Sequence, residues 1–105
     1  MSQIIEIKPG SASAVITLDK VLTIQQGVKH YHLGDSYLID PQDGFTLPVD
    51  IIRVTYSKLK DIQITDLVIH GEKTWEELQE YLENYYPGIT GEDAITVARF
   101  DYKKE

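Results

Sequence analysis

The apolar positions of this sequence gather in short segments rich in isoleucine and valine, which outnumber leucine twenty to nine and favour β-strands. Strands are expected over residues 4–7, 22–24, 36–39, 47–56 and 94–102. The run DPQDG at residues 40–44 predicts a hairpin turn between the third and fourth strands. Ile51-Ile52 interrupts the alternation of the longest strand, which predicts a β-bulge or burial on both sides at that point.

Two helices are expected between the last two strands. Thr65 is placed to cap a short helix over residues 66–70, and Gly71 is placed to end it. Thr74 and Glu77 have the spacing of a capping box, and apolar residues at positions 75, 78, 82 and 85 follow one helix face up to the Tyr86-Pro87 stop. The pattern therefore predicts an α+β fold, a small barrel of about five strands with two helices inserted before the last strand.

The length of 105 residues fits one compact domain, which we assign to residues 1–105. The chain has no cysteine, so disulfides, thiolate metal sites and cysteine nucleophiles are excluded. No apolar run approaches the roughly 20 residues of a membrane span, and the N-terminus lacks the features of a signal peptide. We therefore expect a cytoplasmic protein without membrane association.

The net charge of −7 is unevenly distributed along the chain. Residues 1–60 hold six basic and six acidic side chains, whereas residues 61–105 hold four basic and eleven acidic ones. Five glutamates lie within residues 72–83, which we interpret mainly as a solvated helix face. Because nucleic-acid backbones bind through lysine and arginine, long duplex nucleic acid is not an expected partner. A small ligand, a single exposed base, or a basic protein partner of the acidic helix all remain open.

The sequence offers little evidence for a metal or a cofactor. The glycines are scattered and form no phosphate-binding loop. His30 and His32 would share one face of an extended strand with Asp35 nearby, but nothing else in the chain supplies a convincing further ligand. A solvent-facing histidine pair is the favoured interpretation, so neither a metal nor a cofactor is expected.

Two other groups of residues can carry chemistry. Tyr81, Tyr85 and Tyr86 can stack on a base, although their position on the helix that carries the apolar stripe favours packing. Lys20 can act as a base on the Thr23 hydroxyl if burial removes its proton. The odd spacing of that pair places the two side chains on opposite faces of a regular strand, so the pair alone is a weak signal.

Three segments of the chain resemble the ASCH family when they are taken in order. The first is KVLTI at residues 20–24, which is followed by Gly34-Asp35. The second is HGEKTWEEL at residues 70–78, which is followed by Tyr86-Pro87-Gly88, and the third is the closing strand TVARF at residues 96–100. The resemblance spans roughly residues 14–102 and implies a β-barrel similar to the PUA domains that bind RNA.

For function, the resemblance implies binding of RNA or of a modified nucleoside around Lys20 and Thr23, with Gln25, Gly34 and Asp35 as further ligand-binding residues. Some bacterial members are acetylcytidine amidohydrolases that use a lysine base, a threonine nucleophile and a glutamate acid. The lysine and the threonine fall on Lys20 and Thr23.

The match to the amidohydrolases is incomplete. The glutamate position falls on His70, with Glu72 two residues away, and Gln25 replaces a family arginine. Asp19 and Val21 also depart from the family pattern. We therefore rank binding first, deacetylation of an acetylated pyrimidine nucleoside second, and a protein-interaction domain that uses the acidic helix third.

Overall fold

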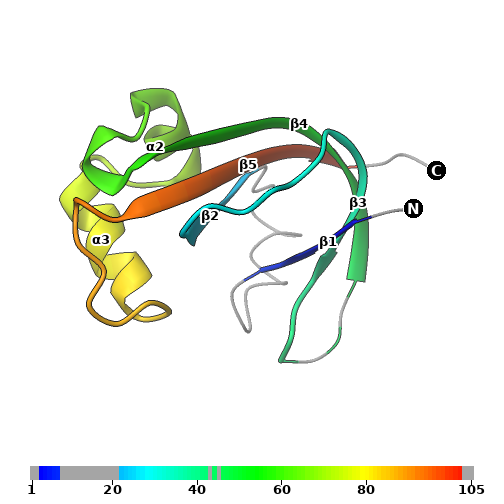
Figure 1. Ribbon diagram of the computed structural model, residues 1–105, viewed down its shortest axis with the longest axis horizontal. Helices are drawn as coiled ribbons and strands as arrows, with labels where there is room; N and C mark the ends of the chain where they lie inside the picture. Colours follow the sequence, from blue (N-terminus) through cyan, green and yellow to red (C-terminus); the bar gives the residue numbers. More distant parts are fainter. Residues whose placement is uncertain (1–2, 8–21, 43, 45, 103–105) are drawn as a thin grey trace.

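The computed structural model describes residues 3–7, 22–42, 44 and 46–102. Its elements are β1 (Gln3–Glu6), β2 (Leu22–Gln26), β3 (Gly34–Ile39), β4 (Thr46–Lys58), the 3-10 turn η1 (Leu59–Asp61), α2 (Ile64–His70), α3 (Trp75–Glu83) and β5 (Ala94–Tyr102). Figure 1 shows the two helices grouped at one end of the sheet, away from β1 and β3. The α+β class and the insertion of two helices before the last strand are confirmed.

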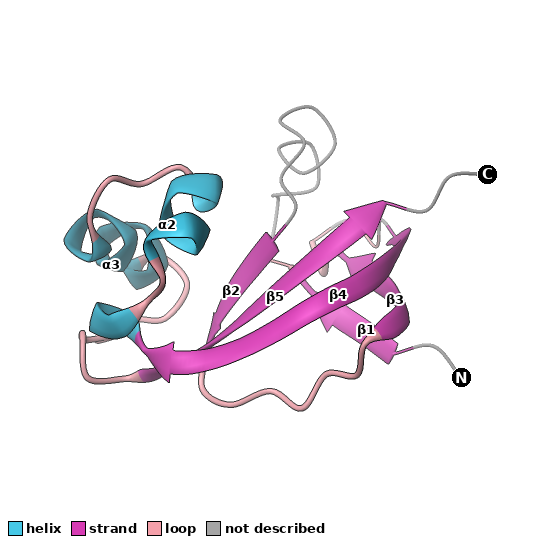
Figure 2. Ribbon diagram, turned by 90° about the horizontal axis from the view of Figure 1, so that it is seen from above, coloured by secondary structure: helices cyan, strands magenta, loops and turns pink. Residues whose placement is uncertain are grey.

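The five strands form one curled sheet in the order β1-β3-β4-β5-β2, which leaves β1 and β2 as its edges (Figure 2). β1 runs parallel to β3, whereas all other neighbouring pairs are antiparallel. The predicted hairpin joins β3 to β4, with Ile39 paired to Thr46. The register of β4 against β5 shifts between Ile51 and Arg53, which confirms the bulge predicted at Ile51-Ile52.

Each face of the sheet carries its own apolar cluster. The helix-side cluster joins residues of β2 and β5 to both helices and includes Leu22, Ile24, Leu67, Leu78, Leu82, Ile95 and Val97. The inner cluster fills the concave face and contains Ile5, Ile7, Leu38, Val49, Ile51, Ala98 and Phe100. Because side chains alternate along β5, residues 95 and 97 serve the first cluster, and residues 98 and 100 serve the second.

Helix α2 begins earlier than the sequence predicts. Its N-cap is Gln63, which makes no side-chain cap, so the prediction that Thr65 caps this helix is wrong. The Gln63 carbonyl accepts a hydrogen bond from the Leu67 N–H at 3.0 Å, and its side chain accepts one from Arg53 of β4. The helix therefore begins without the local side-chain cap that was expected. Gly71 ends the helix as predicted, in the left-handed region at φ 112°.

Helix α3 begins at the predicted cap. The Thr74 side chain accepts a hydrogen bond from the Glu77 N–H at 3.2 Å, while the Glu77 carboxylate accepts one from the Lys73 N–H at 3.1 Å. The reciprocal contact therefore reaches one residue further back than a standard capping box. Leu78 and Leu82 are fully buried in the helix-side cluster. Within the described residues, neither helix has the length and apolar character needed to cross a membrane.

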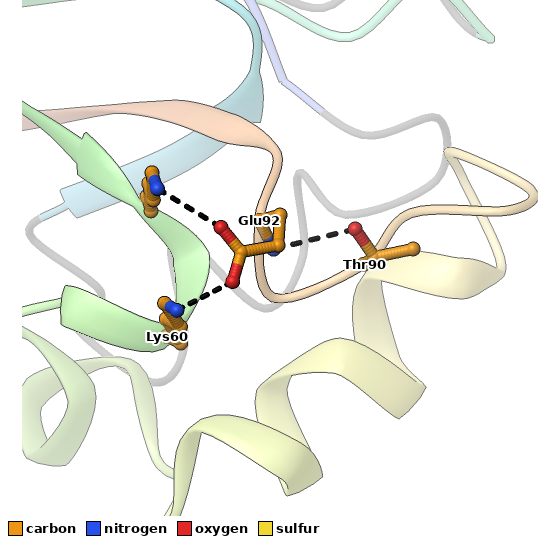
Figure 3. A network of polar contacts seen from close by, with 4 residues as sticks. Lys60, Thr90 and Glu92 are labelled. Carbon is orange, nitrogen blue, oxygen red and sulfur yellow. Dashed lines mark hydrogen bonds and ion pairs between the residues drawn. The ribbon is translucent and has the colours of Figure 1, made fainter.

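The connection from α3 into β5 is held to the end of β4 by exposed ion pairs. The Glu92 carboxylate contacts the ammonium groups of Lys58, at 2.9 Å, and Lys60, while the Glu92 N–H donates to the Thr90 hydroxyl at 3.3 Å (Figure 3). The hydrogen bonds from the two lysines lower the pKa of Glu92 to about 2. Beside it, a Cβ on Gly91 would lie 2.9 Å from the Trp75 ring, so glycine allows Trp75 to pack there.

Candidate functional site

A pocket of about 720 Å³ lies where β1, β2 and the end of α3 come together. The apolar part of its lining comes from Ile4, Ile7 and Pro41, and the remaining lining side chains are polar, charged or aromatic. This volume lies within the range of small-molecule sites in proteins. Since β1 and β2 are the two edges of the curled sheet, we call the gap between them the seam.

Gln25 of β2 joins the two sides of the seam. Its Nε2 donates a hydrogen bond to the main-chain carbonyl of Glu6 in β1 at 2.7 Å, and its Oε1 accepts one from the Tyr31 hydroxyl. Gln25 is buried, although it lines the pocket. A single side chain therefore connects two edge strands that share no backbone ladder in the sheet.

The segment from residue 27 to residue 33 places Lys29 and Tyr31 against the pocket. The buried Thr96 hydroxyl donates to the Gly27 carbonyl at 2.7 Å and accepts from the Lys29 N–H at 2.9 Å. The Tyr56 hydroxyl donates to the Lys29 carbonyl at 2.9 Å. These contacts anchor the segment to β4 and β5, so the pocket wall that it forms is well defined.

The tyrosines at the end of α3 form the opposite wall. Tyr85 and Tyr86 line the pocket, and the Tyr85 ring centroid lies 5.5 Å from that of Tyr81. Burial raises the pKa values of Tyr31 and Tyr86, and it raises the pKa of Tyr81 to about 12. The phenols of Tyr31 and Tyr86 are thus neutral near pH 7, and each carries one hydroxyl proton and an oxygen that can accept a hydrogen bond.

Of the predicted catalytic residues that the structure describes, Thr23 lies on one side of the sheet, and His70 and Glu72 lie on the other. Lys20 lies outside the described residues. Thr23 is buried and pairs across the ladder with Ala98, which belongs to the inner cluster. Leu22 and Ile24, its neighbours, pack in the helix-side cluster, so the Thr23 side chain points away from the helices.

His70 and Glu72 lie close together on the helix side. His70 Nδ1 is 2.6 Å from Glu72 Oε2, and both side chains are largely buried. The His70 and Tyr81 rings pack in a T-shaped arrangement with a centroid distance of 4.9 Å. The structure therefore brings His70 and Glu72 together next to α3, on the face of the sheet opposite Thr23.

The other predicted ligand residues are spread along the chain. Gln25 lines the pocket, whereas Gly34 and Asp35 lie at the start of β3, paired with Ile51 and Asp50 of β4. The proposed roles of Gly34 and Asp35 in binding stay predictions. His30 and His32 lie in the segment between β2 and β3, not in a strand, and no group of three metal-ligating side chains occurs among the described residues.

Sequence reasoning missed Glu6, Lys29 and Tyr31 as pocket residues. The sequence favours packing over stacking for Tyr85 and Tyr86. In the structure Tyr86 contacts the helix-side cluster and also lines the pocket, and stacking of either ring on a base stays a prediction. On the acidic helix, the Glu83 carboxylate accepts a hydrogen bond from the Gly88 N–H at 2.8 Å. At least part of the acidic charge of α3 thus caps backbone groups, and its use by a basic partner stays a prediction.

No family model and no curated protein matches the sequence. Solved structures do match in fold. Protein EF3133 from Enterococcus faecalis V583, described under the family model DUF984, superposes with a TM-score of 0.67 at 12% identity over 97% of this chain and 80% of its own. The ZmASCH protein from Zymomonas mobilis gives a TM-score of 0.61 at 13% identity over 97% of this chain and 70% of its own. The chain thus has the ASCH-like, PUA-like fold that its motifs predict, and at these identities the likeness concerns the fold alone.

Proposed function

We propose that this chain binds a modified nucleoside or an unpaired RNA base in the pocket at the seam. The observation that carries the proposal is the combination of tyrosine rings with a hydrogen-bonded amide in a pocket of about 720 Å³. Unpaired bases are recognised by stacking on aromatic side chains and by hydrogen bonds to their edges, and this pocket offers both kinds of contact. The ASCH-like fold is consistent with this class of ligand.

The charges around the pocket suit a small ligand better than a polymer. Lys29 and Glu6 both line the pocket, so one positive and one negative side chain offset each other in its lining. The acidic side chains of α3 immediately precede Tyr85 in the sequence, and the net charge of the chain is −7. A long phosphate backbone would gain little from such a surface, whereas a single base or nucleoside needs no cluster of cations.

Deacetylation of an acetylated pyrimidine nucleoside is the alternative that the sequence motifs imply. It requires the Thr23 hydroxyl to attack the amide carbonyl carbon while His70 or Glu72 protonates the leaving nitrogen, so these side chains must reach the same amide group. Thr23 faces the inner side of the sheet, whereas the His70–Glu72 pair packs next to α3. Binding is therefore the function that the geometry supports best.

Titration of the intact protein with nucleosides, followed by NMR or calorimetry, tests the proposal. Replacing Tyr85 by Ala is expected to weaken binding by about 1–3 kcal/mol, since this is the usual contribution of one stacked base. Tyr37→Ala is the matched control, because Tyr37 is 43% exposed on β3 and does not line the pocket. Equal losses in both variants, or no binding of any nucleoside by the wild type, would contradict the proposal.

Acetylcytidine, incubated with wild-type protein and with Lys20→Ala and followed by mass spectrometry, separates binding from turnover. The expected result is binding without release of acetate. Release of acetate by the wild type, lost in Lys20→Ala, would establish the hydrolase instead.

A further inference from the structure

We propose that Gln25 and Tyr31 make the pocket selective for a base that presents an N–H donor to the Tyr31 oxygen, such as the amino group of adenine or cytosine, over its keto counterpart. The inference rests on the proposed function, because it assumes that the pocket holds a base. It goes further in naming the pair of residues that determines selectivity and the polarity that they impose.

The orientation of the Gln25 amide follows from its partner in β1. The main-chain carbonyl of Glu6 can only accept a hydrogen bond, and it lies 2.7 Å from Gln25 Nε2. A flipped amide would place Oε1 at that position, so that two acceptors would face each other. The Gln25 amide is therefore held with Nε2 toward Glu6 and Oε1 toward Tyr31.

The fixed amide in turn fixes the hydroxyl of Tyr31. Gln25 Oε1 has no proton to give, so the hydrogen bond between the two side chains uses the single proton of the Tyr31 hydroxyl. What Tyr31 still offers to the pocket is an oxygen lone pair. A ligand N–H can donate to this oxygen, whereas a keto oxygen at the same place would meet another acceptor without a proton between them.

Two neighbours strengthen this polarity. Glu6 lines the pocket and lies close enough to Tyr31 for its negative charge to raise the pKa of the phenol, and the same charge favours an N–H donor there. Tyr86 also lies within electrostatic range of Tyr31. The Gln26 backbone opposes the rise in the pKa of Tyr86, and the neutral Tyr86 hydroxyl carries one proton that it can donate to an acceptor. The Tyr31 oxygen as acceptor and the Tyr86 hydroxyl as donor together match a base edge on which an amino group lies beside a ring nitrogen.

Calorimetric titration of the wild-type protein with adenosine, inosine, cytidine and uridine measures the selectivity. We expect adenosine to bind about tenfold more tightly than inosine, and cytidine about tenfold more tightly than uridine, because leaving one buried polar group unpaired costs about that much affinity. If none of the four binds, the proposed function fails and the inference fails with it. If they bind with equal affinity, the proposed function stands and this inference is wrong.

Two variants assign the selectivity to the pair. Gln25→Met keeps an unbranched side chain of similar length but frees the Tyr31 proton, so inosine and uridine should gain affinity and both ratios should fall toward one. Tyr31→Phe removes the acceptor and should weaken adenosine and cytidine about fivefold to tenfold, with little change for the keto nucleosides. Unchanged ratios in Tyr31→Phe would overturn the inference.

Tyr56→Phe is the matched control. It also removes a phenol hydroxyl that binds the segment between β2 and β3, through the Lys29 carbonyl at 2.9 Å, but Tyr56 does not line the pocket. Both selectivity ratios should keep their wild-type values in this variant. A loss equal to that of Tyr31→Phe would assign the effect to anchoring of the segment and overturn the role of the Tyr31 oxygen. Thermal unfolding of each variant confirms that it folds.

Discussion

The helix side of the sheet and the seam are built from opposite kinds of contact. The helix-side cluster is formed by buried apolar side chains from β2, β5 and both helices. At the seam, the Gln25 amide joins β2 to β1 and also binds the Tyr31 hydroxyl of the segment between β2 and β3. Apolar contacts depend mainly on the area removed from water, whereas hydrogen bonds depend on which partner donates.

This difference indicates that the helix-side cluster mainly determines stability and the seam mainly determines ligand selectivity. An apolar cluster discriminates little between polar groups of a ligand, but loss of side-chain volume lowers its stability. It contributes most of the free energy of folding. A partly buried polar contact contributes less to stability, yet it limits what can lie next to it, because an unpaired acceptor is costly. Changes on the helix side should therefore affect unfolding, and changes at the seam should affect selectivity first.

The largest expected effect on stability is that of Leu78→Ala in the helix-side cluster. Leu78 is fully buried, so its truncation should lower the free energy of unfolding by about 2–5 kcal/mol, measured by urea denaturation. Val68→Ala, on the neighbouring helix and 62% exposed, serves as control and should change it by less than about 0.5 kcal/mol. A nucleoside selectivity that changes in the folded Leu78→Ala protein would contradict the separation of the two regions.

At the seam, Gln25→Met should lower the free energy of unfolding by about 1–2 kcal/mol. The variant leaves the Glu6 carbonyl and the Tyr31 hydroxyl without their amide partner, which accounts for a loss of this size. Urea denaturation at two salt concentrations is the measurement, and the loss should be the same at both, because the contact carries no net charge. A loss as large as that of Leu78→Ala would show that the seam is as important for stability as the helix-side cluster.

Alkaline titration tests how tightly the end of α3 is packed. The pKa of Tyr81 in the folded protein is about 12, above the ordinary value of 10, because burial disfavours the phenolate. Its contribution to stability is therefore complete below pH 10 and declines as the pH rises from about 10 toward 12. Ultraviolet difference spectroscopy of the wild type and Tyr81→Phe should show one tyrosine that ionises last. Ionisation of Tyr81 near the ordinary value of 10 would contradict this packing.

The smallest effect is expected at the exposed ion pairs of Glu92. The pKa of Glu92 is lowered from 4.5 to about 2, so its stabilising contribution is complete above about pH 4.5 and declines as the pH falls toward 2. Since the carboxylate and both lysines are exposed, salt should screen most of the contribution. Thermal unfolding of wild type and Glu92→Gln at low and high salt measures it. A larger loss of stability in Glu92→Gln than in Gln25→Met would contradict the expectation that the neutral contact of Gln25 stabilises the fold more than these exposed ion pairs do.

Much of the fold could be predicted because it is recorded in local patterns. Alternating residues define β5 with its observed bounds of Ala94–Tyr102, and the DPQDG run defines the hairpin between β3 and β4. Gly71 and Thr74 mark the helix ends through their own conformational preferences. The start of α2 escaped prediction because its N-cap, Gln63, makes no side-chain cap, so no local capping pattern marks it.

The pocket could be predicted only in part, for the same physical reason. Its residues come from β1, β2, the segment after β2 and the end of α3, and they meet because the sheet curls until its two edges approach. Gln25 was selected through its position in a family motif, but no local pattern identifies Glu6 or Tyr31 as its partners. The placement of His70 and Thr23 on different faces likewise depends on packing and not on spacing.

The parallel pairing of β1 has a consequence for the motions of the molecule. β1 contributes four residues, and among the described residues its backbone ladder is formed with β3 alone. A short edge strand of this kind can detach while the rest of the sheet stays folded, so its amides exchange with solvent by local opening and not by global unfolding. Any molecule held across the seam would suppress that opening, and its apparent affinity would include the free energy of docking the strand.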